Sequence, residues 1–152
     1  PGLADAEFVR YGQLHRNFYL DTPRVCNGDF SLRNRPDVFI AGQISGVEGY
    51  VESMTSGLVT AWRVAARLRG LELPDLPAES MTGSLLRGFL FDTTTDRLAP
   101  MNVNFGLVPD LREPVRGKRE RKLAKAARSL AACRAWLDSA DVAGLLAAAP
   151  ER

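Results

Sequence analysis

Residues 39–58 read FIAGQISGVEGYVESMTSGL and place four glycines between an apolar run and a helical pattern. Glycine lets the chain adopt left-handed conformations and lets a ligand approach the backbone, because it has no Cβ. The N-terminus of the following helix would present unpaired N–H groups and a partial positive charge. The stretch predicts a strand, a glycine turn and a helix. From these residues alone, a ligand-binding turn and a merely tight turn are equally good interpretations.

The spacing of these glycines differs from the standard nucleotide-binding motifs. Gly42, Gly46 and Gly49 read G-x-x-x-G-x-x-G, whereas a dinucleotide-binding turn reads GxGxxG. No Gly-Lys-Ser/Thr follows them, so the turn is not a P-loop either. Both of these phosphate-binding motifs are therefore excluded at this position.

The segments beside the turn predict its secondary-structure context. Residues 30–33 and 38–41 read as two short extended runs. The second run is apolar without alternation, which is typical of a strand covered on both faces in a parallel sheet. After the turn, apolar residues at steps of three and four predict a helix that ends before Gly70. Gly57 inside this helix indicates either a close approach to another backbone or to a ligand, or a glycine that the helix simply tolerates. The expected buried face consists of Val51, Met54, Leu58, Ala61, Trp62, Ala65 and Leu68.

The second half of the chain predicts three further helices and an ordered loop. The first helix runs from about residue 79 to residue 90, with Leu85, Leu86, Phe89 and Leu90 as its apolar face. Residues 101–111 are compact and non-periodic, and Asn102 and Asn104 either hydrogen-bond within this loop or line a cleft. A long helix over about 117–137 should bury Leu123, Ala126, Ala127, Leu130, Ala131 and Leu137. Asp141 can cap a last helix through Ala148.

The composition indicates an ordinary globular domain. The chain has 152 residues, of which 45% are hydrophobic and 25% are charged. It shows no apolar run long enough to cross a bilayer and no secretory signal. Cys26 and Cys133 lack metal-ligand spacing and read as idle thiols in a reducing cytoplasm. With a single histidine beside them, we expect no metal site.

The net charge of +2 is small but unevenly distributed. Between Arg112 and Arg134, nine basic residues are opposed only by Glu113 and Glu120. Such a block suits a polyanion such as RNA, and a solvated helix face is the ordinary alternative.

Three motifs carry a resemblance to a known family. RYGQLHRN (residues 10–17), FIAGQISGVEGYVES (residues 39–53) and MNVNFGLVP (residues 101–109) occur in the order found in TrmFO proteins. Over residues 2–137 the chain resembles this family of folate- and FAD-dependent tRNA (uracil-5-)-methyltransferases. The glycine turn is also similar to that of the related GidA proteins, which modify wobble uridines. GVEGYVES, LHRN and MNVNFGL favour TrmFO over GidA.

The resemblance implies an α/β fold in three parts. Residues 1–72 would form the C-terminal part of a Rossmann-like FAD-binding domain, with short strands and a strand–glycine turn–helix unit. Residues 73–112 would contain a connector helix and an active-site loop, and residues 113–152 the basic C-terminal helices. Because the chain begins with Pro1, we expect it to start inside a larger protein.

The family reaction and its site residues follow from the same resemblance. In it, methylenetetrahydrofolate supplies a one-carbon unit, NAD(P)H and FAD supply electrons, and C5 of uridine 54 in the tRNA T-loop is methylated in the cytoplasm. The flavin end of FAD would contact Gly42, Gln43, Gly46, Val47, Glu48, Gly49 and Tyr50. His15 would stack on the folate, and Arg10 and Arg16 would pair with its glutamate tail or with tRNA. The residues expected to bind tRNA are Lys118, Arg119, Arg121 and Lys122.

Two parts of the family site are absent from this sequence. The chain has no GxGxxG element for the ADP half of FAD, and Cys26 and Cys133 do not lie in the family's cysteine motifs. We therefore expect no catalytic residue here, and neither tight FAD binding nor tRNA methylation by the chain alone. The alternatives are a GidA-like wobble-uridine modification protein and a non-catalytic RNA-binding module.

Overall fold

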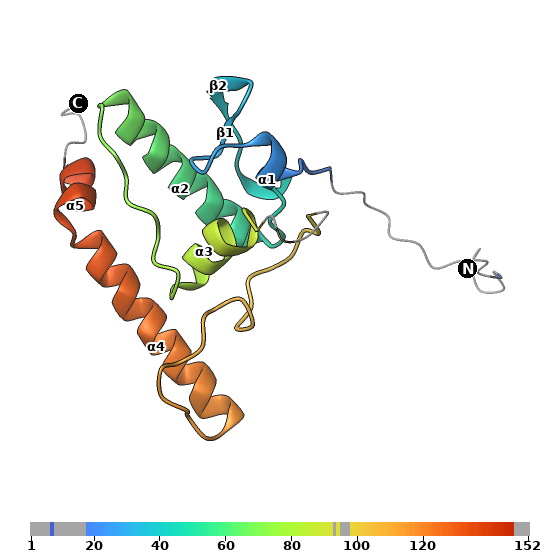
Figure 1. Cartoon of the computed structure of the whole chain (residues 1–152), viewed down its shortest axis with the longest axis vertical. Coiled ribbons are helices and arrows are strands. Elements are labelled where there is room, and N and C mark those ends of the chain that lie inside the picture. The colour runs from blue at the N-terminus through green and yellow to red at the C-terminus, as the bar shows by residue number, and fades with distance from the viewer. Residues whose placement is uncertain (1–6, 8–17, 93, 95–97, 148–152) are drawn as a thin grey trace, which may run out of the picture.

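The computed structural model describes residues 7, 18–92, 94 and 98–147 (Figure 1). The first half contains α1 (Thr22–Val25), β1 (Ser31–Leu32), β2 (Arg35–Phe39), the 3-10 helix η1 (Gly42–Ser45) and α2 (Tyr50–Leu68). The second half contains α3 (Met81–Gly83), the π-helix η2 (Ser84–Phe89), α4 (Lys118–Leu137) and α5 (Ala140–Ala147). The expected order of strand, glycine turn, helix, short helix, loop and long helix is confirmed.

The two strands form an antiparallel hairpin, so the expected parallel strand is wrong in the described part of the chain. Ser31 pairs with Phe39, and the turn at residues 33–34 folds the two runs onto each other. The Asp29 carboxylate accepts hydrogen bonds from the Ser31 N–H (3.0 Å) and hydroxyl (2.6 Å). β2 is exposed at its start and half-buried at Val38 and Phe39, not covered on both faces. The described residues are thus of mixed α/β class, with a single two-stranded sheet at the edge of the helical part (Figure 1).

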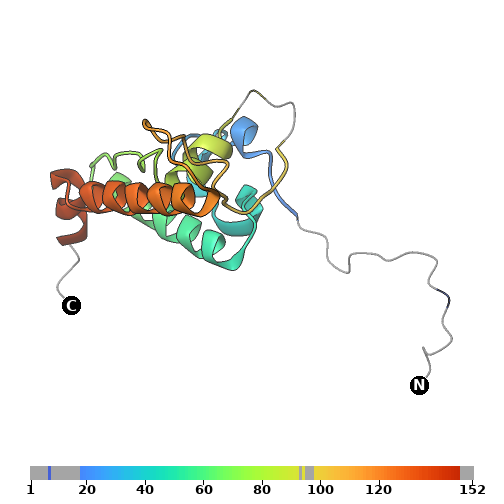
Figure 2. The same cartoon turned by 90° about the horizontal axis from the view of Figure 1, so that it is seen from below.

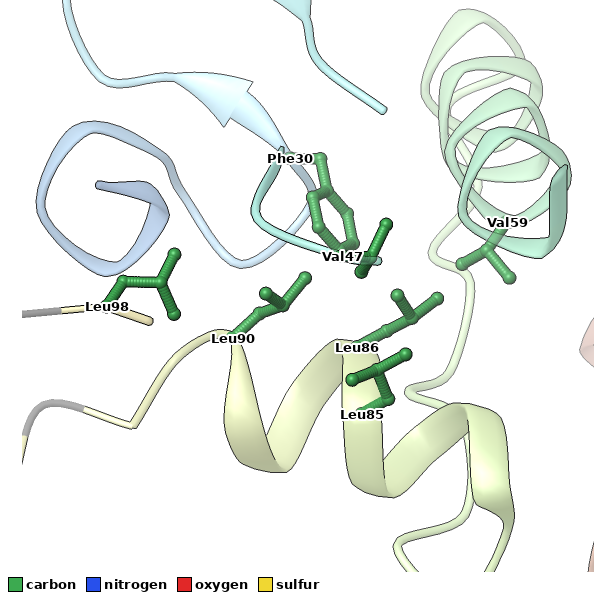
Figure 3. Close-up of a cluster of buried hydrophobic side chains, with 7 residues drawn as sticks. All are labelled: Phe30, Val47, Val59, Leu85, Leu86, Leu90 and Leu98. Atoms are coloured by element: carbon green, nitrogen blue, oxygen red, sulfur yellow. The ribbon is translucent and has the colours of Figure 1, made fainter. Parts of the chain in front are cut away.

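The hydrophobic core gathers side chains from segments far apart in the sequence (Figure 3). Leu85, Leu86 and Leu90 project from η2 and its end towards Val47 of the glycine turn. The remaining members are Phe30, Val59 and Leu98. The expected apolar face of this short helix is confirmed, and Ser80 caps its start by accepting a hydrogen bond from the Gly83 N–H (2.8 Å).

Helix α2 has the expected extent but presents the opposite face to the core. Its buried residues are Ser56, Val59, Thr60 and Ala66, whereas most of the apolar side chains expected inside are exposed. The reason lies in its polar contacts, because the Ser56 hydroxyl accepts a hydrogen bond from the Gly42 N–H (3.0 Å) and fixes that side against the turn. A Cβ on Gly57 would meet no atom within 4 Å, so the expected close approach is also wrong within the described residues.

Helix α4 is likewise correct in extent and wrong in its buried face. Leu123 and Leu130 are exposed, and the buried residues are Lys125, Ser129 and Trp136. Trp136 packs on Trp62 of α2, with ring centroids 5.7 Å apart. The contact between α2 and α4 is thus made by two tryptophans and not by the leucines and alanines that the periodicity indicated.

The last helix starts two residues earlier than an N-cap at Asp141 would place it. α5 begins at Ala140, so Asp141 lies inside the first turn instead of at the N-cap. Figures 1 and 2 show α4 running alongside α2, and Figure 1 shows the connector between α2 and α3 (residues 69–80) passing between these two helices. The Trp136 indole N–H donates to the connector carbonyl of Pro74 (3.1 Å). In the part of the chain that is described, no helix is long and apolar enough to cross a membrane.

Candidate functional site: the glycine turn and its partner loop

The glycine turn (residues 42–50) links β2 to α2. Gly42, Gly46 and Gly49 have φ values of 68°, 91° and 96°. These values lie in the region that side chains with a Cβ rarely adopt, so the backbone path itself requires glycine at all three positions. The unusual spacing of the glycines is therefore a property of the turn's own geometry.

Two of these glycines also admit neighbouring side chains. A Cβ on Gly46 would lie 2.5 Å from the Leu98 Cδ2 atom in the core. A Cβ on Gly49 would lie 2.5 Å from the Asn102 Nδ2 atom and would also touch the Glu52 carboxylate. Gly42 has ordinary space, because its nearest neighbour, the Ser53 Cβ, would be 3.7 Å away. Gly42 is thus the glycine of the turn at which a Cβ would meet only ordinary van der Waals contacts.

The partner loop (residues 101–110) runs alongside the turn. Val47 and Met101 form a parallel bridge, and the Glu48 N–H donates to the Met101 carbonyl (3.1 Å). Asn102 then lies against Gly49. The two segments that carry most of the family resemblance are therefore adjacent in space. Whether Asn102 lines a cleft stays a prediction.

Asn104 hydrogen-bonds within the loop, which is one of the two roles expected for the loop asparagines. Its Oδ1 atom accepts a hydrogen bond from the Gly106 N–H (2.9 Å) and closes a local turn. Such an interaction shapes the loop and leaves the Asn104 side chain exposed.

The N-terminus of α2 lies at the end of the glycine turn. Gly49 occupies the N-cap position and provides no side-chain hydrogen bond to the first turn. Glu52 is the acidic residue of that turn and folds back towards Gly49, where its charge complements the helix dipole. Tyr50 is 92% exposed. The arrangement offers uncapped N–H donors beside a free aromatic ring, which suits the edge and face of a flat polar ligand.

A small hollow opens beside this helix end. It has a volume of about 150 Å³ and is lined by Val51, Glu52, Thr55, Leu85, Leu86 and Val103, among others. Pockets for cofactor-sized ligands usually enclose about 300–1,000 Å³. This hollow alone is therefore too small for such a ligand, and a site of that size would need a further wall from outside the described residues. A larger hollow of about 600 Å³ lies elsewhere, between α4 and residues 111–115.

A buried lysine joins α4 to the partner loop. The Lys125 ammonium donates to the carbonyl groups of Phe105 (3.2 Å) and Val108 (2.8 Å) and to the Asp110 carboxylate (3.0 Å). All three of its N–H donors are used. The hydrogen bond and charge of Lys125 lower the pKa of the Asp110 carboxyl. The basic-block pattern did not distinguish Lys125 from its exposed neighbours, although its burial makes it the structural member of the block.

Two further cations of α4 contact the same loop. Arg128 donates to the carbonyl groups of Asp110 (2.8 Å) and Pro109. The Lys122 ammonium lies 5.6 Å from the centroid of the Phe105 ring, within the range of a cation–π interaction. Residues 122, 125 and 128 recur every three positions and so share one side of the helix. We define these three residues as the α4 clamp.

The residues expected to bind tRNA lie at the start of α4. Lys118, Arg119, Arg121 and Lys122 are all exposed. Lys122 belongs to the α4 clamp, because its ammonium group lies over the Phe105 ring. The other three side chains extend from the same two turns of helix and provide concentrated positive charge.

Several other expected site residues have a different status. His15, Arg10 and Arg16 lie outside the described residues. Cys26 is buried, and burial raises the pKa of its thiol to about 11, which agrees with an idle thiol. Among the residues that the structure describes, no three His, Cys, Asp or Glu side chains are placed to hold a metal ion.

The chain is similar in sequence to one family model and to several named relatives. Residues 1–72 match the family model described as GIDA, Glucose inhibited division protein A. Three relatives are named methylenetetrahydrofolate–tRNA-(uracil-5-)-methyltransferase TrmFO. The chain is 50% identical to that of Oleidesulfovibrio alaskensis over 85% of its length, 48% identical to that of Nitratidesulfovibrio vulgaris over 93%, and 46% identical to that of Thermotoga neapolitana over 91%. The chain belongs to the TrmFO family. It spans 28%, 29% and 32% of the lengths of these three relatives.

Proposed function

We propose that this chain is part of a FAD-dependent methylenetetrahydrofolate–tRNA-(uracil-5-)-methyltransferase. The names of the relatives state the one-carbon donor and the methylated base. In the proposed reaction, the one-carbon unit is transferred to C5 of uridine 54 in the T-loop, NAD(P)H is the reductant, and the location is the cytoplasm, where tRNA is modified.

One observation carries the proposal for this chain: the glycine turn and the partner loop meet at the N-terminus of α2. A Cβ at Gly42 would meet only ordinary van der Waals contacts, and α2 begins without a side-chain cap. Tyr50 stands exposed next to both. In our proposal the flavin end of FAD lies on the glycine turn, where it would supply the electrons that reduce the transferred one-carbon unit.

The residues of the turn then have distinct tasks. The N–H groups at the start of α2 would donate hydrogen bonds to the flavin ring and favour negative charge on its edge. The Tyr50 ring would stack on a flat face and exclude water there. The remaining proposed contacts with the flavin end are Gln43, Gly46, Val47, Glu48 and Gly49. His15 would stack on the pterin ring of the folate.

The start of α4 is the proposed contact with tRNA. Exposed cations release condensed counterions when they bind phosphates, so the affinity should fall steeply with salt. Lys118, Arg119 and Arg121 are exposed and fit this task. Lys122 would contribute less, because it already lies over Phe105.

A GidA-like modification of the wobble uridine is the alternative, because residues 1–72 match the GIDA family model. The two activities change different nucleotides of the tRNA. The position of the modified uridine therefore separates them without reference to sequence.

The cofactor part of the proposal is tested in a full-length hybrid, in which this chain replaces the matched segment of the Oleidesulfovibrio alaskensis relative. We expect the purified hybrid to retain FAD, measured by its absorbance spectrum. Tyr50→Ala should weaken FAD binding, whereas Leu123→Ala, an exposed residue of α4, should not. Equal FAD retention by Tyr50→Ala and the unsubstituted hybrid would count against a flavin at the turn.

A further inference from the structure

Helix α2 leaves an apolar face uncovered. Tyr50 is 92% exposed, Met54 is 68% exposed, and Leu68 is 83% exposed. Val51 (67%) and Leu58 (50%) are exposed as well. Ala61 is also exposed, and Ala65 is half-buried. We define these seven residues as the α2 stripe.

The α2 stripe lies on one side of the helix. At 100° per residue, its members fall within one arc, roughly opposite Val59 and Ala66, which face the core. Val59 points into the core in Figure 3. The charged residues of α2, Glu52, Arg63 and Arg67, all fall outside this arc. An uncharged apolar face therefore runs the full length of a helix of 19 residues.

The polarity of α2 is the reverse of that of an ordinary surface helix. Surface helices turn their apolar stripe to the core and their polar residues to solvent. Here Ser56 and Thr60 are buried in the chain, and the α2 stripe is exposed. Gly57 lies at the edge of the stripe, with open space where a Cβ would be. The backbone of another segment could approach closely at that point.

The exposed leucines of α4 provide a contrast. Leu123 and Leu130 are each 60% exposed, but Arg119 and Arg134 lie four residues from them on the same side of the helix. Charge thus interrupts the apolar surface of α4, as it does on solvated helices. The α2 stripe has no such interruption, and contiguous apolar patches of this kind mark contact surfaces.

We propose that the α2 stripe from Val51 onwards is covered by the polypeptide that TrmFO relatives carry outside the segment matched by this chain, while Tyr50 stays free for the flavin. The matched segment is 28–32% of the three relatives' lengths, so most of each relative lies outside it. The stripe begins at Tyr50, beside a turn whose hollow is too small for a cofactor. Polypeptide packed on the stripe would lie next to this hollow and could enclose the rest of the proposed cofactor site. A second copy of this chain could cover the stripe, but it would bring only the residues that this chain already has.

The inference rests on the exposed side chains and the lengths of the relatives, not on methyl transfer. Its test therefore measures binding and is independent of the proposed activity. The full-length hybrid is purified intact with a protease site at each boundary of this chain, these sites are then cleaved, and the affinity of the released chain for the remainder of the hybrid is measured. The stripe variant is Met54→Gln/Leu58→Gln. Leu123→Gln is the control, because it makes the same change at a similarly exposed leucine of α4.

We expect the unsubstituted chain and the Leu123→Gln variant to bind the remainder equally. The stripe variant should bind about tenfold more weakly or worse, because two polar side chains would be buried in the contact. Its circular dichroism and Tm should match those of the unsubstituted chain, since both positions are exposed in it. If the stripe variant loses helix, Ala61→Glu replaces it, because glutamate is a good helix former, and it must show the same loss of binding.

Three results would overturn the proposal. The first is no binding between the unsubstituted chain and the remainder. The second is an equal affinity of the stripe and control variants for the remainder. The third is a chain dimer that the stripe substitutions dissociate while binding to the remainder is unchanged, which would assign the stripe to a second copy.

Discussion

Replacing Lys125 with methionine should release the partner loop from α4. Methionine has a similar volume but neither the charge nor the three N–H donors. In the native chain, Lys125 is 7% exposed and donates to the carbonyl groups of Phe105 and Val108. The hydrogen bond from Lys125 to the Val108 carbonyl is buried. Losing this hydrogen bond leaves a buried acceptor without its donor.

The magnitude follows from these contacts. Each hydrogen bond from a charged donor contributes about 1.5–3 kcal/mol, and two of them go to backbone carbonyl groups. The pair with Asp110 adds little, because that carboxylate is 97% exposed. Removing the ammonium also removes the cost of burying its charge, which offsets part of the loss. We expect Lys125→Met to lower the free energy of unfolding by about 2–3 kcal/mol.

Urea unfolding of the chain measures this difference, with Lys118→Met as the control because Lys118 is exposed and lies outside the α4 clamp. The control should change stability by less than about 0.5 kcal/mol. Hydrogen exchange should also show faster exchange of the amides of residues 101–110 in Lys125→Met alone. An unchanged urea midpoint together with unchanged exchange would refute the role assigned to the α4 clamp.

Three further predictions concern the turn, the hairpin and the tRNA contact. Gly42→Ala should destabilise the chain by about 1–2 kcal/mol, because alanine is strained at a φ of 68°, whereas Gly88→Ala has open space and should be neutral in the same urea assay. Burial raises the pKa of Asp29, but the Ser31 hydrogen bonds and the Arg67 charge outweigh it and lower that pKa overall. The stability that Asp29 adds is therefore full above its unfolded value of about 3.9 and is lost as the pH falls through the lowered value, and Asp29→Asn should remove this part of the acid transition. In the full-length hybrid, the triple variant Lys118→Gln/Arg119→Gln/Arg121→Gln should bind tRNA more weakly. The slope of log affinity against log salt should become shallower by about 2–3. An unchanged slope would reject the proposed tRNA contact.

Local signals in the sequence predicted the order of the elements well. Helix α2 was expected from its apolar periodicity and its stop at Gly70, and α4 was expected to start at Gly117. The glycine turn was expected from its composition, and its three positive φ values explain why that composition is needed. Such features depend on residues close together in the chain.

Which face of a helix is buried depended on contacts that periodicity does not encode. Ser56 faces inwards because it binds the backbone of Gly42. Trp136 faces inwards because Trp62 and the carbonyl of Pro74 meet it. A stripe of apolar residues shows that a helix has an apolar face but not which polypeptide covers it.

The composition of the site was only partly predictable for the same reason. The motifs indicated that the glycine turn and the partner loop matter, but their Val47–Met101 bridge joins residues distant in the sequence. Among the described residues, β2 pairs antiparallel with β1 across a short turn, so the expected parallel pairing is not found there. Lys125 was read as one cation among nine, since burial is a property of the folded chain.

The most direct test of the proposed function is methylation by the full-length hybrid. The hybrid is incubated with T-loop-containing tRNA, NAD(P)H and methylenetetrahydrofolate labelled in its one-carbon unit, and the tRNA is digested and analysed by mass spectrometry. The proposal predicts a labelled methyl group on C5 of uridine 54, which disappears when methylenetetrahydrofolate is omitted. Unlabelled uridine 54, or label at the wobble position instead, would contradict it.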